Sequence, residues 1–221
     1  MTLAVRFEES VYIPSYVEDF GSFRHWVCSA DFPERGRIDF LEGTIEVDMS
    51  AEELHSHGAL KAELARWLLQ RTKEGNLGPV YLDSARLNCP SVGLSCEPDI
   101  IFVSWSNFQD GSTRYQQAPD RWVEIEGSAT LVVEVVSDSS VGKDLKRLPP
   151  LYAKAGIPEF WRADARGRDI QFEVFHLKDQ EYVAAPPDEE GFLPSLVTGR
   201  RIRLRRDPGP LPGFWQYTLE G

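Results

Sequence analysis

The pattern of apolar and polar positions predicts a chain built mostly of short strands. The longest apolar run, residues 131–136, is β-branched except at Leu131 and Glu134, which is typical of a strand buried on both faces. Shorter alternating or apolar segments predict further strands at residues 37–41, 44–49, 80–83, 85–87, 97–103, 159–164, 170–177, 182–183 and 201–204. Residues 123–127 are expected to be an approach segment that leads into the central strand.

The two strands at 37–41 and 44–49 flank Glu42-Gly43 and predict a β-hairpin. Alternation divides its side chains into two sets. The set expected to face inward is Ile38, Phe40, Ile45, Val47 and Met49. The set expected to face water is Asp39, Glu46 and Asp48.

Three helices are predicted. A short one around Phe20 to Val27 is expected to pack on the core. A longer one starts at Ser50, where Glu53 completes a capping box, and runs to about Lys73. Its expected apolar face consists of Leu54, Leu60, Leu64, Leu68 and Leu69.

The third helix follows the central strand and is limited by Pro149-Pro150. Proline is tolerated in the first turn of a helix but not inside it. The helix is therefore expected to start near Leu148 or Pro149 and to end at Gly156, with any turn through Lys143 to Arg147 separate or kinked.

Length and composition fit one α/β domain with appendages. The chain has 221 residues, of which 42% are hydrophobic. The expected division is an N-terminal extension at 1–36 that packs on the core, a main domain at 37–205 and a Pro-rich C-terminal tail at 206–221. No apolar run approaches the roughly 20 residues of a membrane span, and the N-terminus lacks the order of a signal peptide. Three cysteines without metal-like spacing predict reduced thiols in a cytoplasmic protein.

The net charge of −11 bears on possible partners. General polyanion binders usually carry a basic surface. Contact with nucleic acid would therefore need a local basic patch, or metal ions that screen an acidic site.

Two carboxylates stand out as candidates for chemistry. Glu134 interrupts the buried strand, and Asp99 sits at the mouth of another after Pro98. Together they can hold Mg²⁺ or Mn²⁺, with Lys143 or Lys146 to orient the attacking water and offset charge on phosphate. A structural alternative for Glu134 is a buried ion pair with Arg86 or Arg121. The histidines, including His55 and His57, are interpreted as structural or exposed, and no metal site is predicted from them.

A set of motifs resembles the Uma family of restriction-endonuclease-like proteins, within the PD-(D/E)XK nuclease superfamily. The specific part is Glu134 to Ser137, Ser139-Ser140, Asp144 and Tyr152 to Trp161, preceded by Pro98-Asp99. Residues 43–50 and His57 also look like the family's N-terminal half. The resemblance covers about residues 37–177.

The resemblance implies a restriction-endonuclease-like mixed β-sheet flanked by helices, and a Mg²⁺-dependent endonuclease acting on DNA, with Asp99 and Glu134 as metal-binding acids. The sequence departs from the pattern at the lysine. The two positions where a lysine is expected hold Val136 and Leu148. Lys143 and Lys146 are the nearest replacements, with Arg147 third. The alternative is a catalytically degenerate binding or interaction module. A homodimer is also compatible with the resemblance, because many such nucleases cut as pairs.

Overall fold

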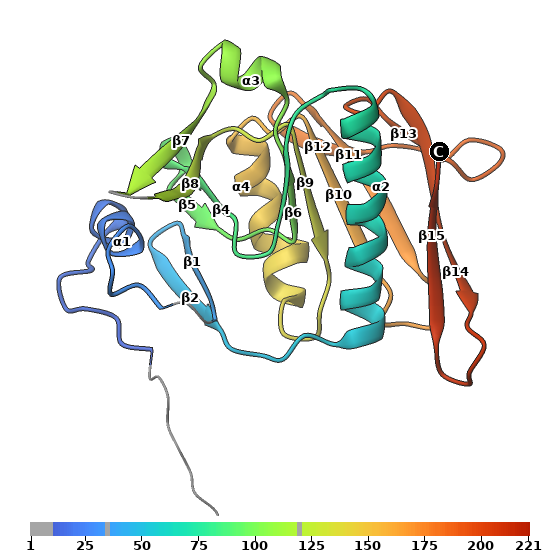
Figure 1. Cartoon of the computed structure of the whole chain (residues 1–221), viewed down its shortest axis with the longest axis horizontal. Coiled ribbons are helices and arrows are strands. Elements are labelled where there is room, and N and C mark those ends of the chain that lie inside the picture. The colour runs from blue at the N-terminus through green and yellow to red at the C-terminus, as the bar shows by residue number, and fades with distance from the viewer. Residues whose placement is uncertain (1–10, 34–35, 119–120) are drawn as a thin grey trace, which may run out of the picture.

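The computed structural model describes residues 11–33, 36–118 and 121–221, and these parts form three β-sheets with helices between and around them (Figure 1). The sheets have the strand orders β2-β1-β5-β4-β8-β7, β12-β11-β10-β9-β6-β3 and β13-β14-β15. The fold is therefore mixed α/β, as the sequence predicts.

The helices are α1 (Phe20–Val27), α2 (Leu60–Glu74), α3 (Trp105–Gln109) and α4 (Leu148–Lys154), with π-helical turns at Leu54–Ala59 and Lys143–Arg147 and a 3₁₀ turn at Pro90–Val92. The strands are β1 (Arg37–Leu41), β2 (Thr44–Asp48), β3 (Val80–Leu82), β4 (Arg86–Cys89), β5 (Leu94–Cys96), β6 (Ile100–Phe102), β7 (Thr113–Ala118), β8 (Arg121–Gly127), β9 (Leu131–Val135), β10 (Glu159–Asp164), β11 (Gln171–Lys178), β12 (Glu181–Ala184), β13 (Leu193–Ser195), β14 (Arg200–Pro208) and β15 (Trp215–Glu220).

Strand β9 lies at the centre of the second sheet, antiparallel to β6 and parallel to β10. Its side chains alternate between two hydrophobic cores, as expected for a strand covered on both faces. Leu131, Val133 and Val135 join the core beneath α2 and the third sheet, whereas Val132 joins the core beneath α4 and the first sheet. Glu134 shares a face with Val132, so its carboxylate points toward α4.

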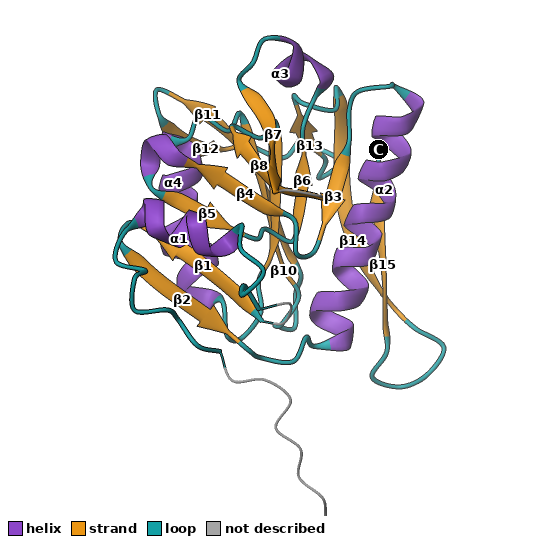
Figure 2. Cartoon of the chain, turned by 60° about the vertical axis from the view of Figure 1, so that its left-hand side comes forward, coloured by secondary structure: helices purple, strands orange, loops and turns teal. Residues whose placement is uncertain are grey.

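The two faces of the central sheet are covered by different elements (Figure 1). On one face lie α2, through Leu60, Leu64 and Leu68, and the β14–β15 hairpin. On the other lie α4 and the first sheet. Helix α1 packs its apolar residues on the β1–β2 hairpin, which confirms the short helix expected there (Figure 2).

The helix predicted from Ser50 begins later than expected. Its N-cap is Glu53, whose carboxylate accepts from the backbone N–H groups of His55 and Ser56, so the predicted capping by Ser50 is wrong. The expected apolar face is also too wide. Leu54 is 75% exposed and Leu69 is exposed as well, because the helix enters through a π-helical turn that shifts the apolar stripe.

The β1–β2 hairpin forms with the predicted turn, but its two faces differ from the expectation. Val47 and Met49 are exposed, and Met49 is 59% accessible. Asp39, expected to face water, is buried. The reason is tertiary: β1 also pairs with β5 on its other edge, and the segment after β9 covers the polar face of the hairpin.

The proline-limited helix is confirmed. Helix α4 begins at Leu148 with prolines in its first turn, and a π-helical turn at Lys143–Arg147 precedes it. The polar segment 104–121 is more than the inserted loop expected, since it carries α3 and β7.

The C-terminal segment differs from the expected tail. The Pro-rich residues 208–212 belong to the connection between β14 and β15, and β15 pairs with β14 over six residue pairs. The strand expected at 201–204 belongs to this third sheet, while β12 forms the edge of the central sheet. Across the described ranges, no helix is long and apolar enough to cross a membrane.

Candidate active site

Asp99 precedes β6, and the antiparallel register of Ile100 with Val133 places it beside Glu134 on β9. Its buried carboxylate accepts the Val135 N–H at Oδ2, at 2.7 Å, and the Arg37 guanidinium at Oδ1, at 3.1 Å. His57 Nε2 lies 3.5 Å from Oδ2. Burial acts to raise the pKa of Asp99, but the hydrogen bond from His57 and the charge of Arg37 outweigh it and lower that pKa to about 2.

Glu134 is buried with fewer donors, and neither of them is a cation. Its Oε1 accepts the Tyr152 hydroxyl at 2.5 Å, and its Oε2 lies 3.4 Å from the Asp99 N–H. Burial, followed by the charges of Asp144 and Asp99, raises the pKa of Glu134 well above its ordinary value. Two carboxylates therefore stand side by side, one held ionised by cations and the other in surroundings that disfavour its ionised form.

The structure separates the candidate lysines. Lys143 is buried and its Nζ lies 2.9 Å from Asp39 Oδ2. Burial lowers the pKa of Lys143, but the charges of Asp39 and Glu134 raise it further than burial lowers it, so the amine stays charged beside the acids. Lys146 is exposed, and Arg147 forms an ion pair with Glu46. Of the three, only Lys143 is brought to Asp99 and Glu134.

Asp39 completes the link between Lys143 and the loop that carries Asp99. Its Oδ1 accepts the backbone N–H of Glu97 at 3.0 Å, while its Oδ2 holds Lys143. Alternation along the hairpin suggested a wet carboxylate here. No local signal distinguishes Asp39 from Glu46 and Asp48, the other acids of the hairpin, and of these only Asp39 is buried.

Asp144 is a further carboxylate at this site that was not among the predicted site residues. Ser140 donates to its Oδ2, whereas its Oδ1 is buried without a hydrogen-bond partner among the described residues. Burial raises the pKa of Asp144 to about 6, against the opposing effects of Ser140 and Lys143. The site thus holds more carboxylate oxygen than its own donors satisfy.

His57 was interpreted as structural or exposed, and it is buried between two acids. Its Nδ1 lies 2.9 Å from Glu52 Oε1, and its Nε2 faces Asp99. Lys61 reaches Glu52 at 2.8 Å and Asp83 at 2.7 Å. A chain of alternating acidic and basic groups therefore leads from the buried Asp99 through His57, Glu52 and Lys61 to Asp83 at the surface.

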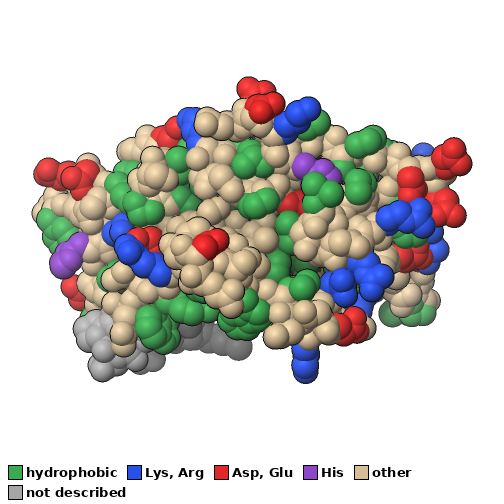
Figure 3. Space-filling model, turned by 90° about the horizontal axis from the view of Figure 1, so that it is seen from above, with side chains coloured by type: hydrophobic (Ala, Val, Ile, Leu, Met, Phe, Trp, Pro, Cys, Tyr) green, Lys and Arg blue, Asp and Glu red, His purple; other side chains and the backbone are tan. Residues whose placement is uncertain are grey.

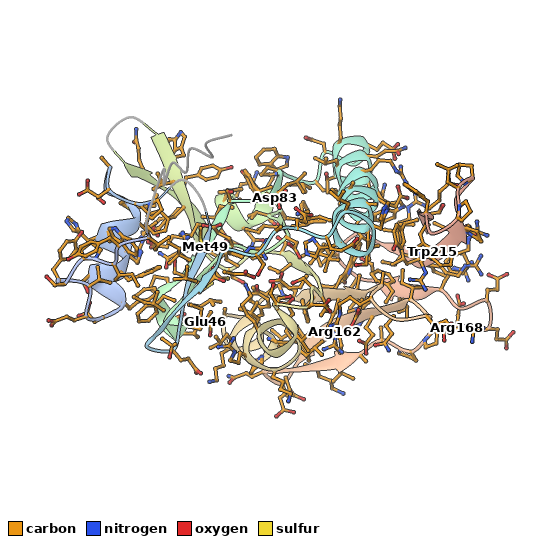
Figure 4. The ribbon with its side chains drawn as sticks, turned by 90° about the horizontal axis from the view of Figure 1, so that it is seen from below. Glu46, Met49, Asp83, Arg162, Arg168 and Trp215 are labelled. Carbon is orange, nitrogen blue, oxygen red and sulfur yellow. The ribbon has the colours of Figure 1, made fainter. Side chains whose placement is uncertain are left out.

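A cleft opens above these groups. Its volume is about 410 Å³, and a second hollow of about 280 Å³ adjoins it, sharing Arg37, Asp48, Ser50 and Ser139. Met49 and Asp83 both line the cleft, and Figure 4 labels them in a view from below. The second hollow is lined by hydroxyl, acidic and basic side chains, and the basic ones are Arg37, Lys143 and Arg147.

Arg86 does not form the ion pair with Glu134 that was considered as a structural alternative. That guanidinium bonds to Glu97 and Ser95 and stacks over Phe32. The side chain of Arg121, the other candidate, lies outside the described residues. An arginine does hold an acid of this site, but it is Arg37 on Asp99.

The donor set fits a hard divalent cation only in part. Among the described residues, no group of three or more His, Cys, Asp or Glu side chains is arranged to hold a metal ion. Mg²⁺ needs no such cage, since it is often bound through one or two carboxylates and keeps several waters. Glu134, repelled by two neighbouring acids, and the unpartnered oxygen of Asp144 are compatible with a bound cation.

A mixed sheet with helices on both faces, and two buried acids side by side at adjacent strands, are the features of a mixed α/β protein of the restriction-endonuclease-like class. The family model Uma2, described as "Putative restriction endonuclease", matches residues 20–205, and the chain belongs to the Uma2 family.

A solved structure shares this fold. It is described as a "putative nuclease belonging to DUF820" from Anabaena variabilis ATCC 29413, and it is similar at a TM-score of 0.58 and 17% identity. The match covers 82% of this chain and 90% of that one. A search of curated proteins gave no significant match.

Proposed function

We propose that this protein is a metal-dependent endonuclease that hydrolyses DNA phosphodiester bonds. The observation that carries the proposal is the pair Asp99 and Glu134, which are buried side by side next to Arg37 and Lys143. Arg37 lines both the cleft and the adjoining hollow, and Lys143 lines the hollow. The family description and the name of the structural neighbour support the same class of reaction.

Asp99 and Glu134 would hold Mg²⁺ or Mn²⁺. Such an ion lowers the pKa of a water nucleophile and stabilises charge on the phosphate and leaving oxygen. Binding at Asp99 Oδ1 competes with the Arg37 ion pair, so metal affinity depends on how readily Arg37 moves. Glu134 offers the less occupied carboxylate.

The chain's own residues prepare the site. The Val135 N–H and the Tyr152 hydroxyl fix the orientations of the two carboxylates. Lys143 and Arg37 place two positive charges where a phosphate in the cleft would gain negative charge, and a partly buried site makes such charges effective. Lys143 is thus our choice for the role of the superfamily lysine.

A second candidate function, a binding module without catalysis, is favoured by one specific observation. Both cations are engaged with carboxylates: Arg37 with Asp99 and Lys143 with Asp39. If these pairs persist when DNA and metal are present, no cation remains to assist hydrolysis. The two functions differ in whether a divalent ion binds and whether cleavage follows.

The test is a plasmid-nicking assay with Mg²⁺, Mn²⁺ or EDTA. Glu134→Ala should abolish metal-dependent cleavage. Lys143→Met should lower its rate by about 10²-fold or more, the range for loss of one positioned electrostatic group. Lys146→Met, a matched exposed lysine on the same turn, should leave the rate unchanged. Full activity of Glu134→Ala would refute the assignment.

Calorimetric titration with Mn²⁺ separates the alternatives. We expect binding to the wild type and none to Glu134→Ala. Metal binding without cleavage of any DNA form would favour the binding module. Absence of metal binding, with unchanged cleavage in EDTA, would exclude the proposed chemistry.

A further inference from the structure

Strand β14 is the most basic part of a strongly acidic chain. Residues 200–206 contain five arginines, and only two acids occur between residues 200 and 220, whereas the whole protein carries a net charge of −11. A DNA-binding function for this chain requires a local basic surface. The β14–β15 hairpin is where such a surface can exist.

The outer face of the hairpin does not provide it. Arg201 pairs with Asp188 and Glu190, and Arg203 and Arg205 both reach Glu220. These exposed pairs cancel charge locally. Figure 3, seen from above, shows acidic and basic side chains gathered together at the end of the molecule where Figure 1 places β14 and β15.

The inner side of the hairpin end is different. Arg206 donates to the backbone carbonyls of Ala165, Gly167 and Arg168, and its guanidinium stacks 4.5 Å from the centre of the Trp215 ring. Carbonyl oxygens fix a guanidinium without cancelling its charge. Arg168 is exposed and has no carboxylate partner among the described residues. The Arg206 guanidinium therefore contacts the backbone of Arg168, and neither arginine has a carboxylate partner among the described residues.

Two aromatic rings accompany these charges. Phe214 and Trp215, at the turn of the hairpin, are 47% and 40% exposed. Exposed apolar surface of this kind can mark an interaction site. Arginine beside exposed aromatic rings is the combination that single-stranded nucleic acid binds, through phosphate contacts and base stacking.

The hairpin end contacts segments that also contribute to the lining of the cleft. The Phe214 ring lies 4.7 Å from that of His55, two residues before the histidine that faces Asp99. From the other side, Arg166, in the same turn as Arg168, bonds to Asp138, whose neighbours Ser137 and Ser139 line the cleft. Figure 4, seen from below, shows Trp215 and Arg168 to one side of Asp83 and Met49.

We propose that Arg168, Arg206, Phe214 and Trp215, here called the hairpin platform, bind the single-stranded DNA segment that flanks the phosphodiester in the cleft. The inference rests on the proposed function for the identity of that cleft. Duplex bases already stack on one another, so an exposed ring gains most from an unpaired base. The platform includes residues beyond 205, where the family match ends.

Fluorescence anisotropy tests the platform without cleavage. The probes are a fluorescein-labelled single-stranded oligodeoxynucleotide and its blunt duplex, in EDTA. Trp215→Ala should weaken single-strand binding by about fivefold or more, the lower end for loss of one stacked base. Arg168→Ala should reduce the slope of log affinity against log salt by about 0.7. Trp215→Phe, which keeps an aromatic ring, should restore most of the affinity.

Arg200→Ala is the matched control. Arg200 is an exposed arginine of the same strand, at the end far from the hairpin turn, and should change neither affinity nor salt slope. Urea unfolding of each variant verifies that the hairpin stays folded.

Unchanged single-strand binding in both Trp215→Ala and Arg168→Ala would overturn the platform, as would preference of the wild type for the duplex or equal losses in Arg200→Ala. Platform-dependent binding by a protein that never cleaves DNA would refute the proposed hydrolysis and leave the platform standing. Cleavage that stays intact when the platform residues are substituted would refute the platform and leave the proposed hydrolysis standing.

Discussion

Glu134 and Glu159 are both fully buried carboxylates on neighbouring parallel strands, yet their surroundings are opposite. Glu159 accepts four hydrogen bonds within 3.1 Å, from Trp161, Ser195, Leu196 and Val197. Glu134 accepts one short bond, from Tyr152, and one long one, and it faces two other acids.

The difference shows how to interpret a buried acid. Glu159 is compensated by donors fixed in the backbone and in β13, and it ties the third sheet to the central one. Such a carboxylate is part of the structure. Glu134 lacks those donors, so its charge is costly unless something else arrives to balance it, which is the condition of a binding or catalytic group. Burial alone does not distinguish the two; the count of donors does.

The largest effect on stability should come from Glu159→Gln. The amide nitrogen would face N–H donors that have no other partner, and each buried unsatisfied group costs about 1–3 kcal/mol. We expect a loss of about 3 kcal/mol or more in the free energy of unfolding, measured in urea. Glu181→Gln, an exposed acid on β12, is the control and should stay within about 0.5 kcal/mol. A small change in the free energy of unfolding of Glu159→Gln would contradict the interpretation of Glu159 as the structural carboxylate of the two.

A pH-dependent effect is expected from Asp144→Asn. Burial raises the pKa of Asp144 from its ordinary value to about 6. The stability tied to its neutral form is therefore fully present below the unfolded pKa and is lost as the pH rises through about 6. Relative to the wild type, the variant should gain on the order of 2 kcal/mol between about pH 4 and pH 7.

The control for Asp144 is Asp138→Asn, whose side chain is 94% exposed. Urea unfolding of both variants across this pH range makes the measurement. A difference from the wild type that does not vary with pH would show that Asp144 is not held in an unfavourable charged form at neutral pH.

The smallest stability change should come from Glu134→Gln. The raised pKa of Glu134 means that its ionised form destabilises the fold at neutral pH, and the Tyr152 hydroxyl can still donate to the amide oxygen. We expect a change between zero and a gain of about 1 kcal/mol in urea unfolding. A loss comparable to that of Glu159→Gln would make Glu134 a structural residue too, and would remove the main support for a site.

The parts of the site that were predicted from the sequence have local signals. Glu134 breaks a β-branched run, and Asp99 follows a proline at the mouth of a strand, so both acids stand out without knowledge of the fold. The register of β6 with β9 then brings them together. Their metal-binding role stays a prediction.

Asp39, Asp144 and His57 could not be found in the same way. Each lies on an element whose local pattern is ordinary, and each becomes buried only because distant segments pack on it. The choice between Lys143 and Lys146 could not be made from the sequence either. The two lysines are three residues apart on one helical turn, and only the packing of that turn decides which amine is buried.

The sequence by itself determined the strand-rich α/β class, the buried central strand, the proline-limited start of α4 and the odd carboxylate at 134, because these follow from short-range periodicity and backbone sterics. Only the tertiary structure decided which charges meet. The partners of Asp39, Asp99 and Glu134 come from four separate parts of the chain. The Pro-rich segment likewise became a hairpin turn because β15 pairs with β14 and packs its apolar face against α2. Electrostatic energies depend on distance and burial, and neither is a property of sequence spacing.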